Sequence, residues 1–157
     1  MAIESPELVN SLANCLGNTV VFYFKAHGHH WNVMGSDFAE FHSFFEEIYE
    51  DAYSAIDPLA ENMRKLGAPA PYKLAEFARL ADIKDGDIGV NAMAMCQDLL
   101  DNSNILIDCL KETFDVSQKV NEQGIANFIA ERIDMHQKWR WQLTSYLSTT
   151  QSGQLGL

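Results

Sequence analysis

The sequence predicts an all-α protein in which four long helices form a bundle and a short fifth helix lies in the crossover between the second and the third. Apolar side chains recur at alternating spacings of three and four residues along four long stretches, which is the period of an amphipathic helix. Glycine, proline or polar turns separate these stretches, and none shows the period of two that indicates a strand. A length of 157 residues is typical of one domain. We therefore expect a single domain over residues 1–157, with a flexible tail at residues 148–157.

The first helix is expected to run from Pro6 to about Val33. Ser5 is a favourable cap, proline suits the first turn, and the carboxylate of Glu7 is favourable at the positive end of the helix dipole. The apolar face consists of Leu8, Leu12, Cys15, Thr19, Phe22 and Ala26.

The second helix should begin after the break at Gly35 and Ser36 and continue to about Leu66. Asp37 followed by Glu40 resembles a capping box, in which each side chain accepts a hydrogen bond from the backbone near the other residue. Pro58 lies inside this helix and lacks a backbone N–H, so we expect a kink or a local widening of the turn that precedes it.

The remaining stretches predict three more helices. A short one occupies Leu74 to Ala81 in the crossover, and a long one runs from about Val90 to Phe114. After a polar turn at Ser117 to Asn121, the last helix continues to about Leu147. We expect four polar side chains of the third long helix to face solvent: Asp98, Asp101, Asn102 and Asp108.

The charge of the chain argues against broad electrostatic attraction to nucleic acid. It carries 22 acidic and 11 basic side chains, which gives a formal net charge of -11. The first basic residue is Lys25, so no basic arm is present at the start of the sequence. Because phosphate neutralisation needs lysine and arginine, DNA binding is expected to be unlikely.

The sequence predicts a cytoplasmic protein without a membrane anchor. Met1 to Asn10 has no basic segment of the kind that begins a signal peptide. The longest apolar run, Val20 to Phe24, is far too short to span a bilayer. The cysteines lack paired-ligand spacing and lie in apolar helical patterns, so we interpret them as reduced core residues. They are Cys15, Cys96 and Cys109.

Imidazole and carboxylate side chains at helical spacing mark a candidate metal site. The set consists of His30, His42, Glu46, Asp57 and Glu61. Such donors suit a metal of iron, zinc or manganese type. His42 and Glu46 share a helix face, and so do Asp57 and Glu61, because the members of each pair are four residues apart. On the second helix they form a stripe that is expected to border the core.

The length of the helix indicates that two subunits share the site. Glu46 and Asp57 are eleven residues apart, which corresponds to about 16 Å along a helix. Ligands of one metal lie about 2 Å from it, so one straight helix cannot bring both pairs to one ion. An antiparallel copy of the helix from a second subunit can do so, and a two-fold axis would create two equivalent sites.

Several of these residues together resemble the Dps family, the ferritin-like mini-ferritins known as DNA-binding proteins from starved cells. The resemblance rests on Lys25-Ala26-His27, His30-Trp31-Asn32-Val33, His42, Glu46 and Asp57-x-x-Ala60-Glu61, and the bundle layout extends it over nearly the whole chain. It implies a ferritin-like fold and a hollow dodecamer built from two-fold dimers. The shell would oxidise ferrous iron, preferentially with hydrogen peroxide and also with oxygen, and store ferric mineral, which protects against oxidative damage.

The resemblance also implies roles for the candidate ligands. His30, His42 and Glu46 of one subunit would form a ferroxidase centre with Asp57 and Glu61 of the two-fold mate. Trp31 is similar to the family's tryptophan beside this centre, an acceptor of stray oxidising equivalents.

The sequence departs from the family pattern at Asn62, where an arginine is usual, and at Pro58 after the aspartate.

Other interpretations compete with the metal site. The five side chains alone would also fit a solvated helix face. A conventional ferritin centre within one bundle needs Glu-x-x-His motifs, but Ala39 and Ile133 stand three residues before His42 and His136. The main alternative is a DNA-compacting Dps-like protein with weak or no ferroxidase activity.

Acidic and histidine side chains outside the ligand set need no role in metal binding. The first group fits either a solvated helix face or an acidic shell interior: Glu47, Glu50 and Asp51. The second is expected in packing or surface roles: His27, His29 and His136.

Overall fold

A computed structural model describes residues 2–148 of the chain and contains five helices in this part. They are α1 (Pro6–Asn32), α2 (Phe38–Lys65), α3 (Leu74–Leu80), α4 (Ala92–Lys119) and α5 (Gln123–Leu147). The all-α class and the short helix in the crossover are confirmed. The predicted tail lies outside the described residues, apart from Ser148. None of the helices described between residues 2 and 148 is long and apolar enough to cross a membrane.

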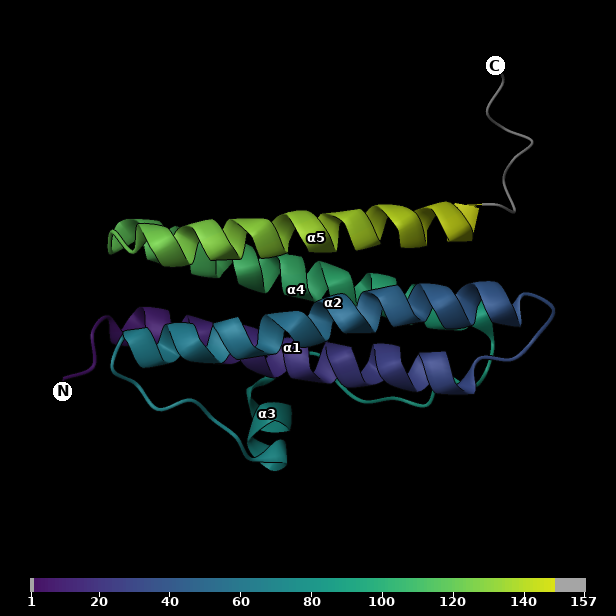
Figure 1. The fold of residues 1–157 in the computed structure, drawn as a ribbon, viewed down its shortest axis with the longest axis horizontal. Coiled ribbons are helices and arrows are strands. Elements are labelled where there is room, and N and C mark those ends of the chain that lie inside the picture. The colour runs from purple at the N-terminus through teal and green to yellow at the C-terminus, as the bar shows by residue number, and fades with distance from the viewer. Residues whose placement is uncertain (1, 149–157) are drawn as a thin grey trace, which may run out of the picture.

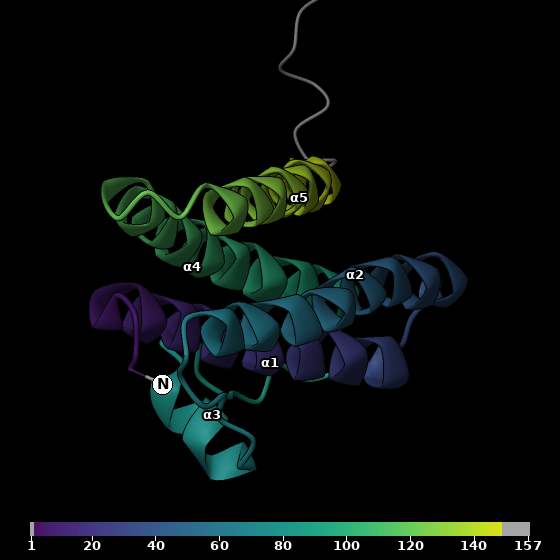
Figure 2. The same cartoon turned by 60° about the vertical axis from the view of Figure 1, so that its left-hand side comes forward.

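The four long helices form two antiparallel pairs (Figures 1 and 2). The α1–α2 pair packs on the α4–α5 pair, and α3 lies on the outer side of α1, away from α4 and α5. The crossover returns the chain to the end of the bundle where α2 begins, since the N–H of Met34 donates to the carbonyl of Val90 at 2.9 Å. As a result, α4 runs in the same direction as α2.

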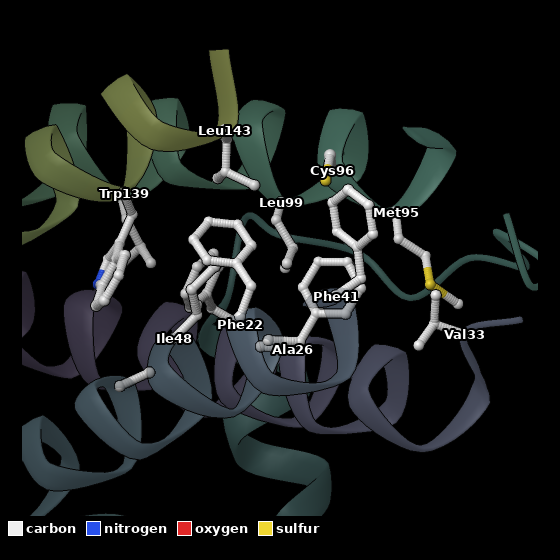
Figure 3. Packing of buried hydrophobic residues seen from close by; sticks show 14 of the residues in the cluster. Phe22, Ala26, Val33, Phe41, Ile48, Met95, Cys96, Leu99, Trp139 and Leu143 are labelled. Carbon is white, nitrogen blue, oxygen red and sulfur yellow. The ribbon is translucent and has the colours of Figure 1, made fainter. Parts of the chain in front are cut away.

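The core lies between the two pairs and consists of the predicted apolar faces. Figure 3 shows one part of it, where Phe22 of α1 and Ile48 of α2 point towards Leu99 of α4 and Trp139 of α5. The side chains of Phe22, Ile48 and Leu99 are fully buried. Burial of such a side chain contributes about 1.5–3 kcal/mol. Packing of helix faces, more than intrinsic helix propensity, therefore stabilises the bundle.

The predicted capping box at the start of α2 was wrong. Asp37 does occupy the cap position, but its side chain accepts no capping hydrogen bond. Glu40 instead accepts a hydrogen bond from the Tyr146 hydroxyl at 3.0 Å, because the end of α5 lies beside this turn. A cap does form on α4, where the Asn91 side chain accepts from the N–H of Ala94 at 3.0 Å.

The polar turn predicted at Ser117 begins later than expected, because α4 continues to Lys119. Ser117 is buried, and its hydroxyl donates to the carbonyl of Thr113 at 2.7 Å. A serine that bonds the carbonyl four residues earlier satisfies its own polar group within the helix. Such a serine therefore does not end the helix, and the chain turns at Asn121, whose φ is +62°.

Of the two effects expected at Pro58, the widened turn was wrong, and the kink stays a prediction. α2 is α-helical without interruption from Phe38 to Lys65, with the proline inside it. The missing N–H would have bonded the carbonyl of Ser54, which is an exposed residue. Water can reach this carbonyl, which reduces the cost of the missing hydrogen bond.

Two aspartates that were expected on polar helix faces are half-buried and form ion pairs between helices. Asp98 of α4 contacts Lys25 at 2.9 Å and His29 at 2.8 Å, which ties α4 to α1. Asp51 of α2 contacts Arg132 of α5 through both carboxylate oxygens at 2.8 Å. Burial raises the pKa of each carboxyl, but the hydrogen bonds and charges of these partners outweigh burial, so both pKa values are lowered. Asp98 therefore does not face solvent. Asn102, which was also expected to face solvent, is buried and donates a hydrogen bond to Asp98 at 3.2 Å. Asp51 belongs to the contact between α2 and α5.

Candidate metal centre

The last turn of α1 and the first turns of α2 hold His30 and His42 in a reciprocal arrangement. Nδ1 of His30 lies 2.6 Å from the carbonyl oxygen of His42, and Nδ1 of His42 lies 2.7 Å from the carbonyl oxygen of His30. A carbonyl oxygen only accepts, so each Nδ1 carries the proton and donates it. In the neutral imidazoles both Nε2 atoms then keep a free lone pair, which is the form that binds a metal.

The two imidazoles are also fixed by ring stacking. Their centroids are 3.7 Å apart with an interplanar angle of 16°. The ring of Phe38 stacks on the outer side of His42 at 4.9 Å. His30 is buried, whereas His42 and Glu46, one turn further along α2, are half-buried. The backbone and the aromatic neighbours therefore hold two nitrogen donors in place before any metal arrives, with a carboxylate one turn away.

Asp57 and Glu61 lie further along α2, and both are exposed in the single chain. The polar stripe therefore borders the core only in its first half, which differs from the expectation for the whole stripe. Asp57 lines a groove of about 550 Å³ between α2 and the crossover, together with Tyr53 and Tyr72. Within residues 2–148 of one chain, no three metal-ligating side chains gather at one point. A single subunit thus holds the candidate ligands as two separate groups.

Aromatic side chains surround the histidine end of the site. Trp31 is 60% exposed, and its ring centroid lies 4.2 Å from that of His27. The His27 ring stacks on Tyr49 at 3.8 Å and 12°, and Tyr49 meets His30 edge-on at 5.1 Å. Burial and the neighbouring His30 lower the pKa of His27, although the carboxylate of Glu46 acts in the opposite direction. His27 thus has a packing role, as expected, but at the margin of the candidate centre.

Sequence reasoning missed Tyr49 and Tyr23 in this region. Tyr23 is four residues before His27 on α1, and its hydroxyl lies 2.9 Å from Nδ1 of that histidine. The spacing of four was the available signal, since such residues are neighbours on a helix surface. Tyr49 had no comparable signal, because its partners His27 and His30 belong to another helix.

Comparison with known proteins shows the class of protein to which this fold belongs. The family model described as a ferritin-like domain matches residues 9–152. The solved structure of the Dps protein from Vibrio cholerae O1, described as a member of a broad superfamily of ferritin-like diiron-carboxylate proteins, has a TM-score of 0.88 at 28% identity. It covers 94% of this chain and 98% of its own. The protein is thus ferritin-like.

Two further comparisons identify the family within the ferritin-like class. The chain is 32% identical to the "DNA protection during starvation protein" of Brevibacillus brevis, over 94% of this chain and 99% of the relative. The structure of a Dps protein from Bacillus brevis has a TM-score of 0.84 at 32% identity and covers 90% of this chain and 95% of its own. This chain belongs to the Dps family.

Proposed function

We propose that this protein is an iron-storing ferroxidase, in which ferrous iron is oxidised by hydrogen peroxide at a centre shared by two subunits. The observation that carries the proposal is the reciprocal pair of hydrogen bonds between the imidazoles and backbone carbonyls of His30 and His42. These hydrogen bonds leave Nε2 of both rings free to donate a lone pair to a metal ion. Two carboxylates of the same helix lie too far along α2 to join them within one chain.

In the proposed centre, His30 and His42 hold the first ferrous ion and Glu46 adds negative charge from the same subunit. Asp57 and Glu61 come from the partner subunit in a two-fold dimer. Each of two ferrous ions gives one electron to hydrogen peroxide, whose O–O bond breaks. Two protons from solvent complete two water molecules, so no hydroxyl radical is released. Ferric product then accumulates as mineral in the shell, and Trp31 accepts oxidising equivalents that escape the centre.

The proposed assembly is a dodecamer of two-fold dimers in the cytoplasm. Support for the dimer comes from the two separate ligand groups on α2, and support for the compartment comes from three buried cysteines that are free thiols. Light scattering should give a mass near twelve times the 17.7 kDa of one chain. A monomer at micromolar concentration would contradict the proposal, because the centre would then lack its second half.

The first test removes one nitrogen ligand. We expect His42→Ala to leave the shell assembled but to slow peroxide-driven iron oxidation by at least about tenfold, which corresponds to about 1.4 kcal/mol in the barrier. Ferric absorbance after addition of ferrous salt and peroxide measures the rate. Glu131→Ala, which removes an exposed carboxylate of α5, is the control and should oxidise iron at the wild-type rate.

Mixed shells test whether two subunits share the centre. In a dimer of one His42→Ala chain and one Glu61→Ala chain, one centre collects both lesions and the other collects neither. We therefore expect mixed shells to oxidise iron faster than shells of either variant alone. If mixed shells, with mixing confirmed by mass, were as inactive as the single variants, the shared centre would be wrong.

A further inference from the structure

Two of the three cysteines face each other where α1 packs on α4. Sγ of Cys109 on α4 donates to Oδ1 of Asn14 at 3.1 Å, and Asn14 directly precedes Cys15 on α1. Sγ of Cys15 lies 3.1 Å from Oγ1 of Thr113, one turn after Cys109 on α4. Each thiol therefore contacts a side chain adjacent to the other cysteine, and the two thiols are neighbours in the same part of the core.

The hydrogen bonds of this group show that both sulfur atoms are protonated. The Thr113 hydroxyl donates its single hydrogen to the carbonyl of Cys109 at 2.9 Å. In its contact with Cys15 the same hydroxyl oxygen must therefore accept, and the Cys15 thiol donates. The Cys109 thiol donates to the amide oxygen of Asn14. Both cysteines are thus neutral thiols that keep lone pairs on sulfur for bond formation.

The two helices approach each other closely at this point, as a covalent link requires. The side chains of cysteine and threonine end at the γ atom, so a contact of 3.1 Å between Cys15 and Thr113 brings the backbones of α1 and α4 close together. A disulfide needs such an approach, because its two Cα atoms are usually about 4.4–6.8 Å apart. Cys96, the third cysteine, belongs to the part of the core shown in Figure 3, with Phe41 and Met95.

Burial decides which of the two thiols meets an oxidant first, and how fast it reacts. Cys15 is fully buried, whereas 6% of Cys109 is exposed, so a solute as small as hydrogen peroxide reaches Cys109 first. The neighbouring thiol of Cys15 and burial raise the pKa of the Cys109 thiol, although Asn18 acts in the opposite direction. Because the thiolate is the reactive form, we expect slow oxidation at neutral pH. A disulfide is uncharged, so burial does not oppose it as it opposes the thiolate.

We propose that Cys15 and Cys109 form a redox modification site, at which hydrogen peroxide converts the two thiols into a disulfide that links α1 to α4. The Cys109 sulfur attacks one oxygen of peroxide, the O–O bond breaks, and the thiol proton joins the departing hydroxide as water. The Cys15 sulfur then attacks the sulfenic acid sulfur of Cys109. An S–S bond forms, and the hydroxyl group leaves with the Cys15 proton as a second water molecule. No iron takes part, so the inference does not rest on the proposed function.

The disulfide fastens the crossover as well as the two helices. Asn14, which accepts from Cys109, also donates to the carbonyl of Leu80 at 2.9 Å and to the carboxylate of Asp82 at 3.1 Å. The link therefore joins α4 to the turn of α1 on which the end of the crossover packs. A bond between residues 15 and 109 closes a long loop, which restricts the unfolded chain and stabilises the folded one. Excess peroxide thereby makes the bundle more resistant to unfolding.

The test exposes the purified, iron-free protein to an excess of hydrogen peroxide for several hours, with a chelator present. Remaining thiols are blocked in denaturant, and the peptides are mapped by mass spectrometry. We expect a peptide pair joined through Cys15 and Cys109, a loss of two hydrogen atoms per chain, and a rise in Tm of several degrees that a reducing agent reverses. Wild-type protein that keeps both thiols, or that links either of them to Cys96, would overturn the inference.

Serine variants separate the chemistry from the packing. Cys15→Ser and Cys109→Ser keep a hydroxyl that can donate the same hydrogen bonds to Thr113 and Asn14, but neither variant can form the link. Their Tm should therefore not rise after peroxide. Cys96→Ala is the control: it removes the remaining thiol and should keep both the joined peptides and the rise in Tm. An equal rise in Cys109→Ser, or the loss of the joined peptides in Cys96→Ala, would contradict the inference and leave the proposed function as it stands.

Discussion

Single histidines of this chain take different roles because their ring nitrogens meet different partners. His30 and His42 donate through Nδ1 to carbonyl oxygens and keep Nε2 free. Nε2 of His29 is hydrogen-bonded to the carboxylate of Asp98 at 2.8 Å. His136 is almost completely buried, with the guanidinium of Arg132 at 3.5 Å from its Nε2. Of these four histidines, only the first pair combines fixed tautomers with available lone pairs, as the proposed iron centre requires.

His136 should make the folded protein sensitive to mild acid. Burial, with the positive charge of Arg132, lowers its pKa to about 3, although Asp51 acts in the opposite direction. The unfolded chain binds a proton near pH 6.5 and the folded chain does not, so stability is fully present above pH 6.5 and falls as the pH decreases towards 3. At pH 5 the expected loss is about 2 kcal/mol, at 1.36 kcal/mol per pH unit below 6.5.

His136→Phe tests this prediction, because it keeps an aromatic ring against Phe22, whose centroid lies 5.3 Å away. Urea unfolding at pH 7 and pH 5 gives the free energies, at one protein concentration. The variant should lose less stability between the two pH values than the wild type, while the contributions of the other histidines cancel in the comparison. Equal losses would show that His136 titrates normally in the folded protein.

At the scale of elements, the crossover is held against α1 by a glycine and an asparagine. Asn18 is fully buried, and its side-chain oxygen accepts from the N–H groups of Asp82 and Ile83 at 2.8 and 3.0 Å. At the residue directly before Asn18, α3 approaches Gly17 so closely that an added Cβ would lie 2.8 Å from Cβ of Leu80. The short helix α3 therefore packs at a fixed position on α1, although none of its own residues is buried.

Gly17→Ala should displace α3 and destabilise the protein. The added methyl group would also meet the backbone carbonyl of Phe77 at 3.0 Å, and overpacking of this kind costs about 1–3 kcal/mol. Gly28→Ala is the control in the same helix, since nothing lies within 4 Å of the new methyl group. It should stabilise the helix by up to about 1 kcal/mol. Thermal unfolding of both variants checks the prediction, and an increase in Tm for Gly17→Ala would contradict it.

For the whole molecule, the net charge favours the binding of iron cations over the binding of DNA. The net charge of -11 repels a polyanion and attracts cations. Of the few basic side chains, Lys25 and Arg132 are largely buried in ion pairs. They are therefore not available to neutralise phosphates.

We expect little or no retention of plasmid DNA in a gel-shift assay at about 0.15 M salt, because too few lysine and arginine side chains are exposed to release counterions. The assay is run with and without a chelator, which removes divalent cations that could bridge the protein and DNA. Retention that persists in the chelator would contradict the prediction and favour the DNA-compacting alternative. The prediction is made although a relative carries the name "DNA protection during starvation protein".

Local sequence patterns were enough to predict the helices and the separation of the two groups of candidate ligands. Periodicity is a local property, so the apolar spacing in α1, α2, α4 and α5 predicted which faces are buried, and helix rise alone kept Glu46 away from Asp57. The contacts between side chains of different helices became visible in the folded protein alone. There Asp98 pairs with Lys25, and Tyr49 contacts both His27 and His30. Such contacts join residues far apart in the sequence, and they depend on how the helices cross, which no local pattern specifies.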